Sequence, residues 1–467
     1  MVYLYLLATL LFVFGIKRLT KVRTCAQGNR LSELGMLTAV VSVLLISGSV
    51  NWAVVIAGMV VGGGVGLFLA KKTPTTQMPE LVAALNGFGG VASALVAIGD
   101  VLTNPDLNGK QATNSIASLD SIVPAIATPI AIIIGMVTLT GSFVAYAKLS
   151  GKNLSHPLSG GARHALHALL GLGAIAVSVW MVNAEGATGI GIAMIVLAAI
   201  GSVLGVLLVM PIGGADMPVV VSLLNSYSGV AGAFAGFVIF SPLLVVVGAM
   251  VGASGLILTQ IMCKAMNRSL GNVLLGGMGG DDAVAEDARD YQSIKQAGPE
   301  EVAMVLDGAS SVIFVPGYGL AVAQAQHVVR ELADLLIDRD VQVRYAIHPV
   351  AGRMPGHMNV LLAESDVPYD QLWEMERING DFKNTDVVII VGANDDVNPA
   401  AREPTGPIAG MPILDVDHAA TVVVIKRSLS PGYAGIKNPL FDNDNTLMVF
   451  ADAKEALEGM VREVKDL

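Results

Sequence analysis

The first 270 residues of the chain consist mainly of long apolar stretches separated by short polar segments. A helix needs about 20 apolar residues to cross the roughly 30 Å of hydrocarbon in a bilayer. Suitable stretches lie near residues 1–16, 32–49, 52–70, 80–99, 122–147, 163–182, 187–211, 216–240 and 242–263. We therefore predict a multi-span α-helical membrane domain of about nine transmembrane helices over residues 1–270.

The apolar stretches are rich in small residues, as in GMVVGGGVGLFLA. Because lipid gives helices no hydrophobic reason to associate, we expect these small residues to allow close backbone packing. The first stretch is followed by the charged segment KRLTKVR. A signal peptide carries its charges before the apolar run, so we expect this stretch to be a retained span.

Charge is distributed unevenly along the 467 residues, of which 53% are hydrophobic and 14% charged. Residues 1–270 contain 13 Lys and Arg against 7 Asp and Glu, and the remainder contains 15 against 31. So acidic a C-terminal part argues against nucleic acid as a partner. The two cysteines, Cys25 and Cys263, indicate neither a disulfide framework nor a thiolate site, and we expect no metal.

Positive charges predict the orientation of the spans, because loops rich in Lys and Arg remain in the cytoplasm. With nine spans, Lys110 falls on one side, and the other twelve cations of this region fall together on the opposite side: Lys17, Arg18, Lys21, Arg23, Arg30, Lys71, Lys72, Lys148, Lys152, Arg163, Lys264 and Arg268. We expect the N-terminus outside and the C-terminal domain in the cytoplasm.

The C-terminal part changes to short β-branched runs that alternate with helical patterns. Residues 271–295 are rich in Gly and then Asp, which is typical of a flexible linker. Near-continuous apolar strands between helices predict a parallel sheet covered on both faces. We expect a Rossmann-like α/β domain over 296–467, with six strands at 310–315, 341–347, 386–391, 412–416, 421–427 and 446–450.

A glycine turn, Gly317-x-Gly319-x-x-Val322, follows the first of these runs and precedes an amphipathic stretch. Strand, glycine turn and helix form the context of a dinucleotide-binding fingerprint. The pattern is weak alone, and it ends in Val rather than Gly or Ala. The GYG within it is also found in potassium-channel filters. That interpretation fails because the turn lies outside every span, so the turn indicates nucleotide binding.

The strand ends favour one nucleotide. NAD-selective folds carry an acid at the end of the second strand, which binds the ribose 2′-hydroxyl. Here that strand runs into HPVAGRMPG, which offers His348 and Arg353 and no carboxylate. The fifth strand ends in Lys426, Arg427 and Ser428, which suit a dianionic phosphate. These cations are alternatively an ordinary solvated pair; with the missing acid, they favour NADP(H).

A long irregular stretch, residues 392–412, leaves the third predicted strand. Loops of this length within compact domains are commonly lids or binding loops. Asn394 and Asp395 lie at the carboxyl end of the strand, where open α/β sheets bind ligands. Asp395 is equally interpretable as a cap or turn residue.

Several motifs together resemble one family along essentially the whole chain. They include MPELVA, IGGADMPVVVSLLNSYSG, MCKAMNRS, PGYGLAVAQAQ, AIHPVAGRMPGHMNVLLAE, GANDDVNPAA and KRSLSPGYAGIKNPLF. The chain is similar to the β subunit of bacterial proton-translocating nicotinamide nucleotide transhydrogenase. The resemblance implies an inner-membrane protein whose partner α subunit carries NAD(H), with hydride passing directly between the two nicotinamides.

The resemblance also implies a cofactor site for NADP(H) and no catalytic side chain in this chain. Gly317, Tyr318 and Gly319 would meet the pyrophosphate, while Lys426, Arg427 and Ser428 would bind the 2′-phosphate. The loop after Asn394 would close over the cofactor. The matching motifs add Val322, Val350, Ala351, Gly352, Arg353, Gly392, Asp395 and Tyr433 to the expected contacts.

Polar residues within or beside the spans are candidates for a proton pathway, because such residues are costly in lipid. They are Asn86, Asn225, Asp216 and His167. Glu80 begins a span and reads as an ordinary helix-end carboxylate; Asp216 is alternatively an N-cap. Many bacterial relatives have a histidine in place of Asn86, and an amide cannot titrate. Our hypothesis places the titrating histidine on a partner helix, with Asn86 hydrogen-bonding a relayed water.

Two other classes of protein remain as alternatives. One is a channel or transporter gated by a cytoplasmic dinucleotide sensor, although such sensors use an acid after the second strand. The other is a membrane-anchored scaffold with a structural nucleotide, which leaves the long loop and the cation cluster unexplained. By analogy with the family, we expect a dimer of α/β pairs in the lipid bilayer.

Overall fold

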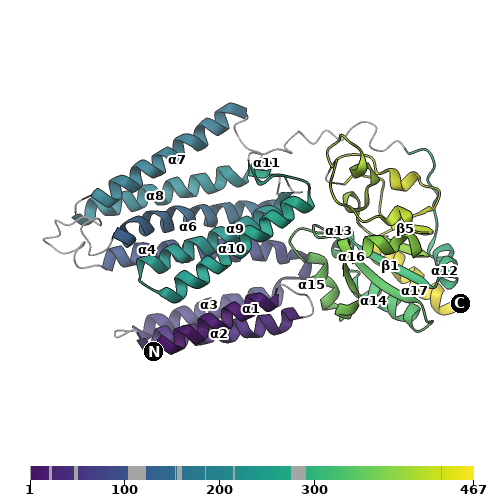
Figure 1. Cartoon of the computed structure of the whole chain (residues 1–467), viewed down its shortest axis with the longest axis horizontal. Coiled ribbons are helices and arrows are strands. Elements are labelled where there is room, and N and C mark those ends of the chain that lie inside the picture. Colours follow the sequence, from purple (N-terminus) through teal and green to yellow (C-terminus); the bar gives the residue numbers. More distant parts are fainter. Residues whose placement is uncertain are drawn as a thin grey trace. The chain divides into compact units, whose positions relative to one another are not determined.

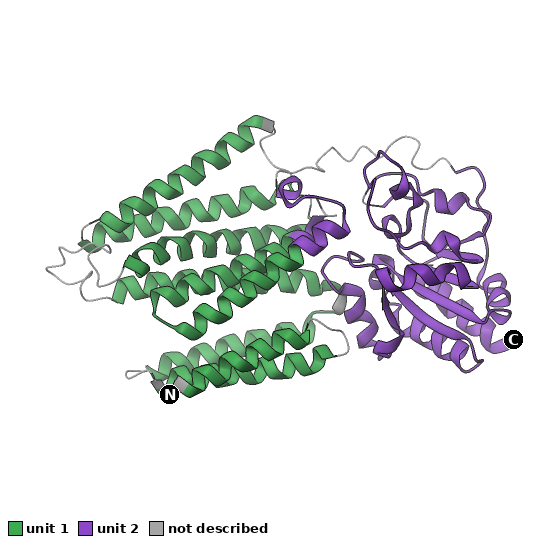
Figure 2. Ribbon diagram, in the orientation of Figure 1, with its two compact units in different colours: residues 1–212, 220–259 green, residues 213–219, 260–467 purple. Residues whose placement is uncertain are grey.

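The computed structural model describes residues 2–19, 24–46, 51–103, 122–152, 154, 160–184, 186–213, 216–274, 291–432 and 434–467. The chain divides into two compact units (Figure 2). Unit 1 comprises Met1–Ile212 and Val220–Thr259, and unit 2 comprises Gly213–Val219 and Gln260–Leu467.

Long helices occupy all nine of the predicted apolar stretches in the described N-terminal region (Figure 1). They are α1 (Val2–Leu19), α2 (Cys25–Ile46), α3 (Trp52–Lys72), α4 (Met78–Thr103), α6 (Ile122–Leu149), α7 (Gly160–Asn183), α8 (Gly186–Val209), α9 (Met217–Val238) and α10 (Pro242–Ala265). Among the described residues, seven of these, α3 to α10, are long and apolar enough to cross a membrane. The helix α2 begins earlier than expected, so Arg30 lies within it.

Small residues bring the backbones of these helices close together, as the composition predicts. A Cβ atom built on Gly135 of α6 would lie 2.5 Å from the carbonyl oxygen of Gly90 of α4. One built on Gly229 of α9 would lie 2.4 Å from the backbone nitrogen of Gly252 of α10. No larger residue fits at these crossings without moving a backbone, and close approach is the interaction that lipid leaves available.

The C-terminal domain contains a six-stranded parallel sheet with strand order β3-β2-β1-β4-β5-β6. The strands are β1 (Ser311–Pro316), β2 (Gln342–Ile347), β3 (Leu372–Glu374), β4 (Val387–Val391), β5 (Thr421–Ile425) and β6 (Thr446–Val449). The strand order reverses between β1 and β4, which is where open α/β sheets bind ligands. The predicted Rossmann-like fold is confirmed.

Alternating residues of each strand enter two separate cores. In β1, Val312 and Phe314 join the core beneath α12 (Pro299–Asp307), α13 (Tyr318–Ala323), α14 (Gln326–Ile337), α15 (His357–Glu364) and α17 (Ala453–Asp466). Ile313 and Val315 join the opposite core, which includes residues of α16 (Met375–Ile378). The strands are therefore covered on both faces, which explains their continuous apolar runs.

One predicted strand is wrong. Residues 412–416 form no strand, and β3 takes the place of the missing sixth member. Leu414 is fully buried, but its amide donates to Asp396 O in a loop rather than to a neighbouring strand. A buried loop and a buried strand both require apolar residues, so the composition of residues 412–416 does not distinguish them. The strand β3 was missed because three residues are too few to show a recognisable periodicity.

The remaining short elements lie in connections. They are α11 (Leu270–Leu274) and the 3-10 helices at Thr75–Gln77, Tyr369–Gln371, Asn379–Asn384, Asp395–Val397, Pro399–Arg402, Val416–His418 and Pro439–Asp442.

Candidate functional site

The glycine turn after β1 is bonded directly to the turn after β4. The amide of Gly317 donates to Val391 O (2.9 Å), and the amide of Gly319 donates to Gly392 O (3.0 Å). A Cβ atom on Gly392 would lie 2.3 Å from the Cα atom of Gly319, and the φ of Gly392 is +68°. The two loops can cross here because all three residues lack side chains.

The amphipathic stretch after the turn forms two helices rather than one. The helix α13 ends at Ala323, and α14 begins at Gln326. Gln324, between them, adopts left-handed backbone angles of φ 50° and ψ 40°. The break separates the short helix α13, which follows the glycines, from the longer helix α14, which covers the sheet.

A cavity of about 480 Å³ opens beside this crossing. Eleven of the predicted cofactor-binding residues line it: Tyr318, Gly319, Val322, Val350, Gly352, Gly392, Asn394, Asp395, Lys426, Arg427 and Ser428. They come from segments that follow β1, β2, β4 and β5, so the carboxyl edge of the sheet gathers four loops that are distant in sequence.

Three other predicted residues are not among those that line the cavity. Gly317 packs against the loop after β4, where a Cβ atom on it would be 2.4 Å from the backbone nitrogen of Ala393. Ala351 is buried. The Arg353 guanidinium lies 4.4 Å from the ring centre of Tyr318, which positions that ring. Tyr433 lies outside the described residues.

Lys426 is a partly buried cation in the cavity lining. Burial lowers its pKa to about 8, although the charge of Asp395 opposes this shift. Its Nζ atom donates to the carbonyl oxygen of Ser430 and lies 5.1 Å from the centre of the Phe441 ring. The side chains of Arg427 and Ser428 are exposed at the same strand end. This set of donors fits a phosphate group.

His348, at the end of β2, ties two loops together. Its Nε2 atom lies 2.8 Å from Pro412 O, its Nδ1 atom accepts from the Val350 amide (3.3 Å), and Asp396 Oδ1 lies 3.5 Å from Nδ1. Asp396 also lines the cavity. A carboxylate therefore reaches the end of β2 from the loop after β4, although the sequence near that strand offers none.

Asp395 positions one loop at the cavity. Its Oδ2 atom accepts from the Ala434 amide (3.0 Å), and a Cβ atom on Gly432 would lie 2.5 Å from its Oδ1 atom. The amide of the neighbouring Asn394, turned so that its oxygen faces Gly432 N and Lys426 Nζ, accepts from both at 2.6 and 3.2 Å. Asp395 thus lines the cavity and also bonds a backbone amide.

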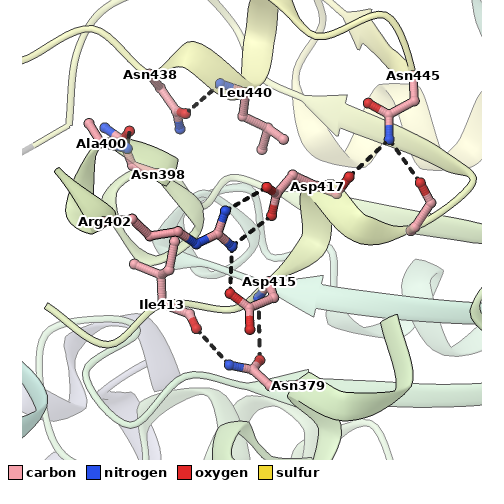
Figure 3. Close-up of polar contacts among 11 residues, drawn as sticks. Asn379, Asn398, Ala400, Arg402, Ile413, Asp415, Asp417, Asn438, Leu440 and Asn445 are labelled. Carbon is pink, nitrogen blue, oxygen red and sulfur yellow. Dashed lines mark hydrogen bonds and ion pairs between the residues drawn. The ribbon is translucent and has the colours of Figure 1, made fainter. Parts of the chain in front are cut away.

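The long loop after β4 is closed at its base by ionic and polar contacts (Figure 3). Arg402 bonds both Asp415 and Asp417, which lie at the far end of the loop. Asn379 donates to Ile413 O (2.8 Å) and accepts from the Asp415 amide (3.3 Å). The part of the loop between these contacts supplies Pro407, Ile408 and Met411 to the cavity lining.

Sequence reasoning missed other lining residues. Asp396, Pro407, Ile408 and Met411 belong to the long loop that was singled out as a binding loop, but no pattern marked them individually. Residues 430–432 and 451–453 also line the cavity. The latter follow β6, and their position after a parallel strand is the signal that could have identified them.

In the membrane helices, the structure brings Asn86 close to the face of α9 that carries Asn225. The side-chain nitrogen of Asn86 donates to Val221 O (3.2 Å), and Asn86 is buried. Val221 and Asn225 are four residues apart on one helix and share a face. Ser222, the next residue along α9, accepts a 3.1 Å hydrogen bond from Thr259 of α10.

Asp216 pairs with Arg268 rather than with the residues of that region. Asp216 is buried before α9 and forms a bidentate pair with Arg268, at 2.9 and 3.1 Å. His167 lies in the second turn of α7, half-buried. Glu80 lies in the first turn of α4, as expected, but it is buried. Among the described residues, no three His, Cys, Asp or Glu side chains gather as a metal site.

Comparison with known proteins agrees with these features. The family model "NAD(P) transhydrogenase beta subunit" matches residues 1–463. Two curated sequences, each described as NAD(P) transhydrogenase subunit beta, from Rhodospirillum rubrum and from its strain ATCC 11170, are 46% identical over 461 residues. These matches cover 98% of this chain and 97% of each relative. The chain therefore belongs to the NAD(P) transhydrogenase beta subunit family.

Proposed function

We propose that this chain binds NADP(H) in the cavity at the carboxyl edge of its sheet. The single observation that carries the proposal is the position of Lys426, Arg427 and Ser428 at one strand end, beside the crossing of Gly319 and Gly392. The glycines admit a ligand close to the backbone, and the cations suit a 2′-phosphate. When bound, the nicotinamide ring supplies or accepts a hydride.

The role of this chain in hydride transfer is binding and orientation. A partner α subunit, which the beta subunit name implies, would hold NAD(H), and hydride would pass directly between the two rings. A direct transfer of hydride between the two rings would release no proton and would need no acid or base from this chain. The segment between Arg402 and Asp415 would exclude water through Ile408 and Met411.

Hydride transfer would be coupled to proton movement through the membrane helices. The proposed pathway includes Asn86, Asn225, Asp216 and His167. An amide orders water but does not titrate, so we place the titrating histidine on a partner helix, beside Asn86. Proton translocation that survives replacement of every histidine in the partner's spans would overturn this assignment and direct attention to His167.

The charge distribution supports one arrangement in a bacterial inner membrane. The N-terminus would lie outside, the C-terminal domain in the cytoplasm, and two α/β pairs would form the assembly. The test introduces a cysteine by Ser115→Cys, in the segment that carries Lys110. This cysteine should be labelled from outside intact cells. Labelling only after permeabilisation would show that the orientation is the opposite one.

The decisive experiment measures NADPH and NADH affinity for the full-length chain in detergent. Wild-type protein should prefer NADPH, and Arg427→Ala should weaken NADPH binding by about 10- to 100-fold, the size of a charge-assisted hydrogen bond. NADH binding should change little. Arg462→Ala, which removes an exposed arginine from α17, is the matched control. Equal affinity for the two nucleotides in wild-type protein would refute the proposal.

A further inference from the structure

The segment that follows residue 290 is attached to the edge of the sheet. The amide of Met448 in β6 donates to Lys295 O (2.7 Å), and the amide of Ala297 donates to Met448 O (3.0 Å). Residues 291–295 are the last residues of the expected linker, 271–295, and the expected C-terminal domain begins directly after them. A displacement of the linker would therefore reach the domain first through the contacts of this segment.

Three residues at the start of this segment, Tyr291, Gln292 and Ser293, form what we call the linker anchor. The amides of Gln292 and Ser293 both donate to Asp442 Oδ1, at 3.1 and 3.2 Å. The other carboxylate oxygen of Asp442 lies 2.6 Å from Lys437 Nζ, which in turn lies 4.8 Å from the centre of the Tyr291 ring.

A first chain of contacts leads from the linker anchor to Asn394 at the cavity. The backbone amide of Asn438 donates to the hydroxyl oxygen of Tyr291 (3.2 Å). The side-chain nitrogen of the same Asn438, which is fully buried, donates to Asn394 O (3.0 Å). Asn438 Oδ1 accepts from the Leu440 amide (3.1 Å) (Figure 3). One buried residue thus joins the anchor to a cavity loop.

A second chain of contacts leads from the linker anchor to Lys426. The rings of Tyr291 and Phe441 are 5.7 Å apart between centres. Lys426 Nζ lies 5.1 Å from the centre of the same Phe441 ring, which is fully buried. Packed interiors transmit displacements because they contain little free volume. Movement of Tyr291 therefore shifts the supports of both Asn394 and Lys426.

We propose that the linker anchor regulates nucleotide retention, with Tyr291 as a positioning residue that holds Asn394 and Lys426 in the arrangement that retains NADP(H). This inference rests on the proposed function of the cavity. Coupling between two sites is reciprocal, so bound nucleotide must also hold the anchor against the domain more tightly. A residue that merely stabilised the fold would not have this second property.

The test uses the full-length chain in detergent and NADPH as the probe. Tyr291→Phe removes the hydroxyl acceptor and retains the ring, so NADPH affinity should fall by about threefold to tenfold, the effect of one neutral hydrogen bond. Tyr291→Leu also removes the ring and should weaken affinity further. The control is Lys295→Ala. Lys295 lies on the same segment as Tyr291 and forms an exposed ion pair with Asp444, and its loss should leave NADPH affinity unchanged.

Hydrogen–deuterium exchange at Gln292 and Ser293 provides the second readout. Their amides should exchange more slowly when NADPH is bound to wild-type protein, and Tyr291→Phe should lose this dependence on nucleotide. An affinity for NADPH that is unchanged in both Tyr291 variants, or amide exchange that is indifferent to NADPH, overturns the inference alone. A wild-type chain without preference for NADPH overturns the proposed function as well.

Discussion

Arg402 is bonded to Asp417 through both terminal nitrogens of its guanidinium group. Nη1 lies 2.6 Å from Oδ2 and Nη2 lies 2.9 Å from Oδ1, while Nη2 also bonds Asp415 (Figure 3). This geometry joins the two ends of the segment that supplies Ile408 and Met411 to the cavity. Such a fork cannot be reproduced by lysine, because a guanidinium offers paired donors in one plane.

Replacing Arg402 by Leu should weaken both the loop and nucleotide binding. The expected loss of unfolding free energy is about 1 kcal/mol, a value discounted because the Arg402 side chain is 40% exposed. NADPH affinity should also fall, because Arg402 joins the two ends of the segment that supplies Ile408 and Met411 to the cavity. Thermal unfolding and NADPH titration measure the two effects. Arg330→Leu, which breaks an i,i+4 pair with Asp334 on α14, is the control and should alter stability alone.

The same contact should depend on pH in one direction. Burial opposes ionisation of Asp417, but the hydrogen bonds and charge of Arg402 outweigh it and hold the pKa of Asp417 below its ordinary value. Because the pKa of Asp417 is lower in the folded protein than in the unfolded chain, its ionised carboxylate stabilises the fold above the unfolded pKa of about 3.9. This stabilisation is lost as the pH falls through the folded pKa. The stability difference between wild type and Arg402→Leu should therefore shrink below about pH 4. A difference that is constant from pH 7 to pH 3 would contradict the assignment.

Lys426 should make anion binding sensitive to alkaline pH. Burial lowers its pKa to about 8, so in the free protein it loses its charge as pH rises through that value. NADPH affinity should fall between about pH 7.5 and 9.5. Lys426→Arg keeps its charge throughout and should give a flat profile, whereas Lys426→Met should bind weakly at every pH. A wild-type profile as flat as that of the arginine variant would remove Lys426 from the phosphate site.

Gly392→Ala should disrupt the cavity without a change in charge. The added Cβ atom would lie 2.3 Å from Gly319 Cα, and the residue has a φ of +68°. We expect a loss of about 2 kcal/mol or more in unfolding free energy, together with loss of NADPH binding. Gly380→Ala is the matched control, since nothing lies within 4 Å of its Cβ position. Near-normal binding by Gly392→Ala would show that the two loops can separate.

The Asp216–Arg268 pair should be costly to break from one side. Both side chains are largely buried, at 3% and 12% exposure, so Arg268→Gln leaves a buried carboxylate without its cation. We expect about 3 kcal/mol of destabilisation. Asp216→Asn combined with Arg268→Gln should recover much of it, because an amide pair carries no net charge. Additive losses in the double variant would exclude a direct interaction.

Local features of the sequence are enough to divide the chain into a membrane part and a sheet domain. Hydropathy and β-branched runs are local properties, so they located the helices of the membrane part and five of the six strands. The sequence also predicts that the glycine turn and the strand end at Lys426 lie at one edge of the sheet, because the loops that follow parallel strands all emerge at their carboxyl ends.

Which distant residues meet at the site depends on the tertiary structure. It replaced residues 412–416 by β3 in the sheet, since a buried loop and a buried strand have the same apolar composition. It brought Asp396 to His348 at the end of β2, where the sequence offered no acid. It also joined Tyr291 to Asn438, 147 residues away. Contacts between loops depend on the shape of the whole domain, and no local pattern of residues encodes that shape.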